Sequence, residues 1–393
     1  MNFRISRTVW SVLFACLCMV ALGLSDNIRG PLFAELLSFF KVTNAAGSLS
    51  FAVASTANLV GTLVSTRMLN RIHLDRLLLF SMVFMGVGLL GMSQAPTYLL
   101  FITGAIIFGF SMGTTGVAQN LLIAENIQQT YQPKVFSGLH GIYGLSSLMA
   151  PFIASRAPTW FRDNFPNSGP LTEWRSAFFL TAVLCLLLFI AIAVTRAEPH
   201  FESAHHGSQT KKKIKDKRAL IYISLFFAGY VAAEILVATR LALYMRTYFS
   251  MDLEQSSNYV TYFFIFLLAG RLFFTVKSLN IALRKQLSIS LILSMVTIVL
   301  GLTVHPMFLA ATGLCMAPFY PMSVAYIAEL TGPMNRTYFT TALAIQSIFV
   351  VGMHVGVGYL TDVFGLFYAY GISIVLLLMA LICVNAHPQV PVE

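Results

Sequence analysis

The sequence alternates long apolar stretches with short polar ones from end to end. A helix that crosses a bilayer needs about 20 mostly apolar residues, and twelve stretches of this kind can be marked. They run approximately over residues 8–40, 45–69, 77–92, 97–124, 135–154, 174–194, 219–248, 255–276, 286–304, 307–328, 338–360 and 365–384. The pattern predicts an all-α membrane protein with twelve transmembrane helices.

One polar stretch divides these helices into two groups of six. Residues 195–218 are charged and contain the basic run KKKIKDKR. We therefore expect an N-terminal six-helix bundle over 1–194, a basic linker over 195–218 and a C-terminal six-helix bundle over 219–393. The groups also echo each other, because Ile-Ala-Glu occurs near the end of the fourth predicted helix and again near the end of the tenth. Parallel repeats of six helices, with the binding site at their interface, are a known transporter plan.

Composition and charge agree with a membrane location. Hydrophobic residues make up 57% of the chain and charged residues only 10%, whereas soluble domains carry about a quarter charged residues. The formal net charge is +10. With the N-terminus inside, few basic residues fall on the outer side: Lys41, Arg156, Arg162, Arg175 and Arg246. This asymmetry follows the positive-inside rule, so we expect an inner-membrane protein with both termini cytoplasmic. The basic linker then contacts lipid headgroups, and nucleic acid is not an expected partner.

Charged residues inside the predicted helices are the strongest functional signal. Asp26 and Arg29 lie three residues apart in the first helix, so they share a face and can pair. Glu234 holds a similar depth in the seventh helix, and Arg240 follows six residues later. An ionisable group at mid-bilayer costs at least ~2.5–3.5 kcal/mol and normally faces water or a partner. Two interpretations remain open: these residues line a solute pathway and take part in coupling, or they form internal ion pairs that hold helices together.

Other polar side chains at similar depth complete the candidate site. The segment Pro318–Pro321 interrupts the tenth helix, and interrupted helices tend to line cavities. Candidates for solute binding or coupling are Asp26, Asn27, Arg29, Gln119, Asn120, His140, Tyr143, Glu234, Arg240, Tyr320, Gln346 and His354. Candidates for gating at the inner ends are Arg71, Arg76, Glu125, Arg271 and Glu329. We expect Glu125 and Glu329 to lie beside basic residues such as Arg71 and Lys277.

The chain resembles the major facilitator superfamily over nearly its whole length. The resemblance rests on the two six-helix groups, the basic linker, Asp26 followed by Gly30-Pro31, and the corner between the second and third helices. In that family the corner reads G-x-x-x-D-R/K-x-G. Here Thr66, Asn70 and His73 replace the Gly, Asp and Gly of that motif. Arg71 and Arg76 keep its basic character.

Within the superfamily, several short motifs look like those of the fucose permease group of proton–sugar symporters. They are Leu139-His140-Gly141 with Tyr143-Gly144, Tyr230-Val231 with Glu234, and Gly270-Arg271. That group commonly has a tryptophan a few residues after the acid of the seventh helix, where this chain has Arg240. The added cation would suit a solute that bears a carboxylate or a phosphate.

We therefore expect a secondary transporter that binds a sugar or a small organic anion between its halves and works by alternating access as a monomer. Coupling to protons would use Asp26 or Glu234, and sodium is the alternative ion. No Gly-x-x-x-x-Gly-Lys loop and no His-Glu-x-x-His motif occurs, so neither an ATP-driven pump nor another enzyme is expected. The five cysteines lie in apolar helices, and we expect no cofactor or metal. Two alternatives stay open: an exporter of drugs, siderophores or metabolites, and a transport-inactive accessory or sensor protein.

Overall fold

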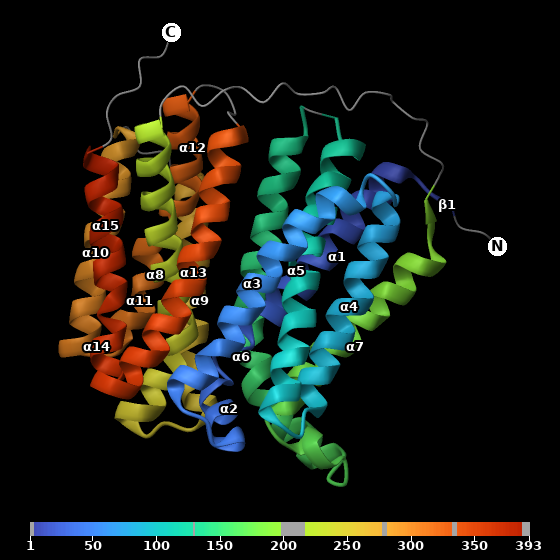
Figure 1. Ribbon diagram of the computed structural model, residues 1–393, viewed down its shortest axis with the longest axis horizontal. Coiled ribbons are helices and arrows are strands. Elements are labelled where there is room, and N and C mark those ends of the chain that lie inside the picture. Colours follow the sequence, from blue (N-terminus) through green and yellow to red (C-terminus); the bar gives the residue numbers. More distant parts are fainter. Residues whose placement is uncertain (1–3, 129, 198–216, 277–280, 332–335, 387–393) are drawn as a thin grey trace. The chain divides into compact units, whose positions relative to one another are not determined.

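The computed structural model describes residues 4–128, 130–197, 217–276, 281–331 and 336–386. Helices make up nearly all of this part of the chain (Figure 1). The only strands in these ranges are β1 (Arg4–Ile5) and β2 (Arg196–Ala197), which pair in parallel. The expectation of an all-α protein is therefore confirmed.

The helices follow the expected order along the chain. Their bounds are α1 Arg7–Asn27, α2 Phe33–Phe40, α3 Asn44–Met68, α4 Leu74–Gln94, α5 Tyr98–Asn126, α6 Gln132–Asn164, the short 3₁₀ helix η1 Gly169–Thr172, α7 Arg175–Val194, α8 Lys217–Phe249, α9 Leu253–Val276, α10 Leu283–Thr303, α11 Met307–Met316, α12 Phe319–Thr331, α13 Arg336–Phe364, α14 Leu366–Tyr370 and α15 Ile372–Ala386.

Two predicted spans are interrupted at proline. The first span divides into α1 and α2 at Gly30-Pro31, and the tenth divides into α11 and α12 at Ala317-Pro318. Proline has no N–H to donate to the preceding turn, and its ring clashes with the carbonyl four residues earlier. The interruption predicted within Pro318–Pro321 is thus present, and it lies at the start of that segment.

Eleven candidate spans in the described part of the chain are long and apolar enough to cross a membrane. They include α11 with most of α12 as one span, Met307–Ile327, and α14 with α15 as another, Leu366–Ala386. The one predicted span without a counterpart among them is the fifth, 135–154, which lies inside α6, a helix of 33 residues. Glycine, serine and histidine dilute its apolar character, so its membrane location follows from the helices it packs on rather than from its own composition.

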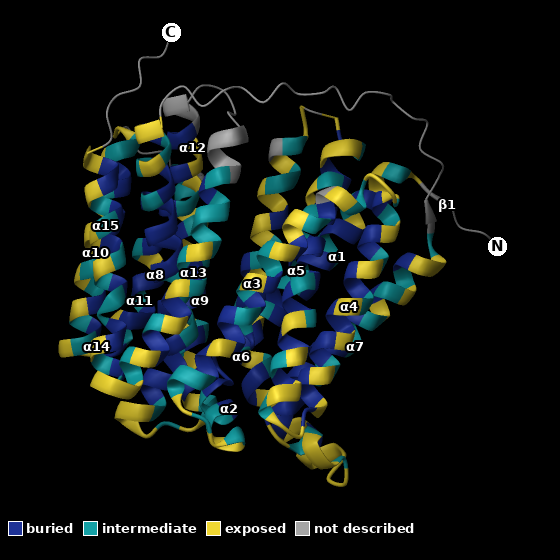
Figure 2. Cartoon of the chain, in the orientation of Figure 1, coloured by how far each residue is buried: buried dark blue, intermediate teal, exposed yellow. Residues whose placement is uncertain are grey.

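The chain divides into two compact units. The first contains Met1–Glu35 and Val53–Gly207, and the second contains Leu36–Ala52 and Ser208–Glu393. Within each unit, buried residues gather on the helix faces turned toward other helices of that unit (Figure 2). The first nine residues of α3 group with the second unit and the rest of that helix with the first. The hydrophobic pattern of the sequence gives no sign that α3 is divided between the two units.

Equivalent glycines bring helices close together in both units. A Cβ atom on Gly109 of α5 would lie 2.1 Å from the carbonyl oxygen of Ala54 in α3, and one on Gly113 would lie 2.1 Å from that of Asn58. In the second unit, a Cβ atom on Gly313 of α11 would lie 2.3 Å from the carbonyl oxygen of Phe263 in α9. Small residues permit such close approach in membranes. Gly109 and Gly313 each stand 16 residues before the glutamate of an Ile-Ala-Glu sequence, so the repeated offset corresponds to the same kind of packing contact in both units.

Candidate functional site

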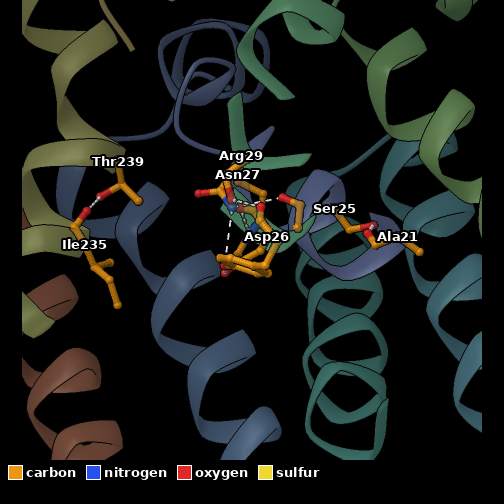
Figure 3. A network of polar contacts seen from close by, with 10 residues as sticks. Ala21, Ser25, Asp26, Asn27, Arg29, Ile235 and Thr239 are labelled. Atoms are coloured by element: carbon orange, nitrogen blue, oxygen red, sulfur yellow. Dashed lines mark hydrogen bonds and ion pairs between the residues drawn. The ribbon is translucent and has the colours of Figure 1, made fainter. Parts of the chain in front are cut away.

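One charged pair of the first unit, Asp26 and Arg29, lies where α1 ends. Arg29 donates to Asp26 Oδ1 through Nη2, so the ion pair predicted from their spacing is confirmed (Figure 3). The other carboxylate oxygen, Oδ2, accepts from the Tyr143 hydroxyl of α6 at 3.0 Å. The guanidinium carbon of Arg29 lies 5.2 Å from the centre of the Phe108 ring. The side chains of Asp26 and Arg29 are 28% and 12% exposed, so the pair is held among protein groups with limited access from outside.

A second set of hydrogen bonds fixes this end of α1 against α6. Asn27 Nδ2 lies 3.0 Å from Ser147 Oγ, 3.3 Å from the Tyr143 hydroxyl and 2.9 Å from the Gly23 carbonyl. A Cβ atom on Gly23 would lie 2.8 Å from Ser146 Cβ, so this glycine is needed for the close approach. The tyrosine therefore stands where both polar groups of α1 can reach it.

The remaining candidates of the first unit differ in their surroundings. Gln119 is 2% exposed, and its Nε2 donates to Met19 Sδ at 3.4 Å. Asn120 and His140 are both exposed. Gly116, Gly138 and Gly141 have open space where a Cβ atom would be. The glycines and polar residues of α5 and α6 thus border space as well as close helix contacts.

Near the start of α4, the first unit forms a different ion pair from the expected one. Arg7 of α1 makes two bonds of 2.6 Å to the carboxylate of Asp75 in α4, and its Nε donates to Asn126 Oδ1 at 3.0 Å. Arg71, Arg76 and Glu125 are exposed. Among the ion pairs of the described ranges, none joins Glu125 to Arg71. Lys277 and the side chain of Glu329 lie outside the described residues.

The second unit gathers an acid, a cation and a tyrosine from two helices, α8 and α9. Glu234 of α8 lies 3.6 Å from Arg271 of α9, measured from Oε1 to Nη2. The Tyr230 hydroxyl, one turn earlier on α8, contacts Glu234 Oε2 and lies 2.7 Å from the Met316 carbonyl oxygen of α11. The Tyr230 ring stacks on Phe319, with the ring centres 4.0 Å apart. Tyr320 of α12 lies within electrostatic reach of Arg271 and Glu234.

Arg240 does not serve as the cation of this acid. It is 1% exposed, its Nη2 donates to Ser48 Oγ at 2.8 Å, and its guanidinium carbon lies 5.0 Å from the centre of the Phe51 ring. Six residues along a helix correspond to about 9 Å of rise and a rotation of roughly 120° away from the starting face. Arg240 thus lies on another face of α8, and Arg271 is the cation that lies beside Glu234.

Arg240 belongs to a cluster that holds the start of α3 within the second unit. His354 of α13 stacks on Phe51, with ring centres 4.9 Å apart. At the end of α13, Asp362 accepts from the backbone N–H groups of Asn44 and Ala45 at 2.9 and 2.8 Å. A carboxylate at a helix N-terminus satisfies N–H groups that have no partner inside the helix. His354 is thus 2% exposed and packs in this cluster, while Gln346 is half-buried on the same helix.

Comparison with known families now identifies the fold. The family described as the Major Facilitator Superfamily matches residues 15–241, more than half of the chain. The chain belongs to the major facilitator superfamily. This confirms the resemblance drawn from the sequence and the expected fold.

Superfamily members of known name resemble the chain at low identity. It is 24% identical over 265 residues to sodium-dependent glucose transporter 1A of Mus musculus, covering 61% of this chain and 62% of that one. It is 26% identical over 276 residues to sodium-dependent glucose transporter 1 of Homo sapiens, covering 62% and 52%. It is also 20% identical to a Protein TsgA homolog of Edwardsiella ictaluri (strain 93-146), covering 69% and 65%. The chain thus spans less than two thirds of each relative's length.

Solved superfamily structures match the fold over almost the whole chain. A bacterial homolog of the human lysosomal transporter Spinster, inward-facing and occupied, gives a TM-score of 0.76 at 11% identity and covers 97% of each chain. The D-xylose–proton symporter gives 0.75 at 14% identity, covering 98% and 99%. FucP in the outward conformation gives 0.64 at 15% identity, covering 98% and 100%. At these identities the likeness concerns the superfamily fold alone.

The structure also shows polar residues of this superfamily member that the sequence did not single out. Tyr230, Asp75 and Asp362 each bridge two helices, and none was a site candidate. Asp75 and Tyr230 stand within motifs quoted for the superfamily resemblance, so their positions carried a signal. Asp362 had a weaker one, as a lone acid at the end of an apolar helix.

Proposed function

We propose that this protein is a secondary active transporter that carries a sugar or a small organic anion by alternating access, coupled to protons. Family membership supports the transporter class. Relatives and structural neighbours named as glucose, xylose and fucose transporters support the solute class. The solute would bind between an N-terminal bundle, 1–194, and a C-terminal bundle, 219–393, joined by the linker 195–218.

One observation carries the proposal of ion coupling. Each unit brings a carboxylate, a cation and a tyrosine hydroxyl together: Asp26, Arg29 and Tyr143 at the end of α1 and on α6 in the first, and Glu234, Arg271 and Tyr230 on α8 and α9 in the second. Intramembrane ionisable groups are costly and mark ion or solute pathways. A packing role alone would be met at lower cost by apolar side chains.

The charge asymmetry supports an inner-membrane location with both termini cytoplasmic. A reporter fused at Glu393 tests this: a cytoplasmic reporter should be active there and a periplasmic one silent. The opposite pattern would reverse the proposed topology. Partial activity of both reporters would be resolved by a second fusion after Ala386, at the end of α15.

Transport is tested with purified protein in proteoliposomes. Radiolabelled D-glucose, D-xylose, L-fucose and D-glucuronate are supplied with an inward proton gradient, an inward sodium gradient or no gradient. We expect one of the solutes to accumulate only under the proton gradient. Accumulation under sodium alone would replace the proposed ion and keep the transporter. Release only from preloaded vesicles would indicate an exporter, and neither uptake nor counterflow of any solute would favour the accessory protein.

A further inference from the structure

The hydroxyl of Tyr230 stands between two oxygen atoms and carries a single hydrogen. One neighbour is Glu234 Oε2, and the other is the carbonyl oxygen of Met316 at 2.7 Å. A phenol donates one hydrogen bond and accepts others, whereas a carbonyl only accepts. If Tyr230 donates to an ionised Glu234, the Met316 carbonyl faces a phenol oxygen with no hydrogen between them. If Glu234 is protonated, it donates to Tyr230, which then donates to Met316, and both contacts are satisfied.

The chain of hydrogen bonds ends at the Met316 carbonyl, which lies at the break between two helices. Met316 is the last residue of α11, and Ala317-Pro318 separates it from α12. The last four carbonyls of a helix lack partners within that helix, and buried carbonyls are costly to leave without a donor. Tyr230 supplies a donor from α8 at the interruption of the tenth span. Its ring also stacks on Phe319, the first residue of α12, so it touches both sides of the interruption.

We infer that Glu234 is the carboxyl that carries the coupled proton, and that Tyr230 transmits its protonation to the break between α11 and α12. The inference rests on the proposed transport function and assigns coupling to one of its two acids. Loss of the proton turns the Tyr230 hydrogen from Met316 toward the carboxylate, so the carbonyl at the break loses this donor. The same loss strengthens the attraction between Glu234 and Arg271. One proton thereby changes contacts that join α8, α9, α11 and α12.

The groups around Glu234 are compatible with this role. On neighbouring helices, Arg271 of α9 lies 3.6 Å away and Tyr320 of α12 lies within electrostatic reach. Arg240 and His354 contact Phe51 on the start of α3, and the Tyr370 hydroxyl of α14 donates to the Val237 carbonyl at 3.0 Å. Glu234 is 21% exposed. The acid thus keeps access for a proton while having one cation close to it.

The first test reads the carboxyl directly and needs no solute. Infrared difference spectra of the full protein in lipid are recorded through a pH titration. We expect a protonated-carboxyl band that is lost in Glu234→Gln and kept in Asp26→Asn. Tyr230→Phe should shift the pH at which this band disappears by about one unit, because the phenol accepts from the protonated acid but donates to the carboxylate, and the two forms lose contacts of unequal strength. An unchanged titration in Tyr230→Phe would overturn the inference.

Matched variants control for packing. Tyr370→Phe removes an equally buried hydroxyl that donates to a carbonyl of α8, and it should leave the titration unchanged. Arg271→Gln should move the band to higher pH, because the ionised acid loses its cation. Were Glu234→Gln to fail to yield folded protein, the shifts in Tyr230→Phe and Arg271→Gln would still show whether the band belongs to Glu234. A band that disappears at the same pH in both variants as in the unmodified protein would overturn the inference.

The second test separates this inference from the proposed function. With whichever of the four solutes is taken up, Glu234→Gln should abolish uphill accumulation and keep counterflow. Full accumulation by Glu234→Gln would overturn the coupling role while leaving the transporter intact. If the unmodified protein transports none of the solutes, the proposed function fails, and the infrared titration still decides whether Tyr230 reads the protonation of Glu234.

Discussion

The acid sites of the two units contain the same three kinds of side chain but connect them differently. In the first unit, Asp26 receives Arg29 on one oxygen and the Tyr143 hydroxyl on the other. Both partners donate to the carboxylate, so each of its oxygens has a partner within the unit. In the second unit, Arg271 lies 3.6 Å from Glu234, and the Tyr230 hydroxyl is shared with a backbone carbonyl. That shared hydroxyl is the geometric basis for proposing Glu234 as the proton carrier.

The difference teaches that composition alone does not assign a coupling role. Asp26 is the more conspicuous residue in the sequence, because its arginine is three positions away and shares its face. That proximity is what suits it to a lasting ion pair at the end of α1. Glu234 has its cation on another helix and at a greater distance, so proton exchange changes its surroundings more.

The largest expected effect is on accumulation. Glu234→Gln should remove uphill uptake completely, whereas Asp26→Asn should retain a proton-dependent component in whatever protein folds. The reason is that the proposal assigns the coupled proton to Glu234 alone. Proteoliposome uptake under an imposed pH gradient measures both variants side by side. Loss of uphill uptake in Asp26→Asn with normal uptake in Glu234→Gln would reverse the comparison.

A clear pH effect should distinguish the two arginines. Removing a cation near an acid that titrates makes its carboxylate less favourable, so the proton is released at higher pH. Arg271→Gln should therefore shift the pH profile of coupled uptake upward, and Arg29→Gln should leave its midpoint in place. The profile is measured by initial uptake rates over a pH series. An upward shift in Arg29→Gln alone would assign the proton to Asp26.

The Asp26–Arg29 ion pair should contribute to the stability of the protein. Asp26→Asn leaves Arg29 without its carboxylate in a largely enclosed position, and we expect a loss of about 2 kcal/mol or more in the free energy of unfolding. The double variant with Arg29→Gln should recover part of the loss, because no charge is then left uncompensated. Thermal unfolding followed by intrinsic fluorescence gives the comparison. Equal stability of the single and double variants would remove the ion pair as a stabilising contact.

The glycine contacts should be equivalent in the two units. Gly109→Ala and Gly313→Ala each place a methyl group against a backbone carbonyl, and we expect destabilisation of about 1–3 kcal/mol from overpacking. Gly116→Ala is the matched control on the same helix as Gly109, since nothing lies within 4 Å of its Cβ position. It should be neutral or slightly stabilising. If Gly313→Ala alone caused no loss of stability, α9 and α11 would be able to move apart to accommodate the methyl group.

The smallest effect is expected at the start of α3. Asp362→Asn weakens the acceptor of two backbone N–H groups at an exposed position, so the loss should be no more than about 1 kcal/mol. Hydrogen exchange of residues 44–48 should nevertheless quicken, because the cap acts locally. Thr361→Ala, the adjacent position on α13, controls for a general change at the end of that helix. Unchanged exchange in Asp362→Asn would show that the cap contributes nothing.

A contact within one helix and one of the two helix breaks followed from the sequence by itself. The Asp26–Arg29 pair was predicted from helical spacing, and the break at Pro318 from the interruption by proline. The break at Pro31 was not predicted, because residues 8–40 were expected to form one span. The apolar stretches likewise fixed where the helices run, because backbone groups in lipid must be satisfied within helices. The glycine offsets indicated close packing but not which partner helix is approached.

Tertiary structure alone decided the partners that come from different helices. Sequence distance favoured Arg240 as the cation near Glu234, but helix rotation turns it to Ser48 and Phe51, and Arg271 of α9 takes its place. The Tyr230–Met316 contact and the cap of α3 by Asp362 depend in the same way on relative depth and rotation of whole helices. Periodicity says which face of a helix is apolar, and it leaves open what stands opposite. The shared hydrogen of Tyr230 is therefore visible only once α8 and α11 have been packed together.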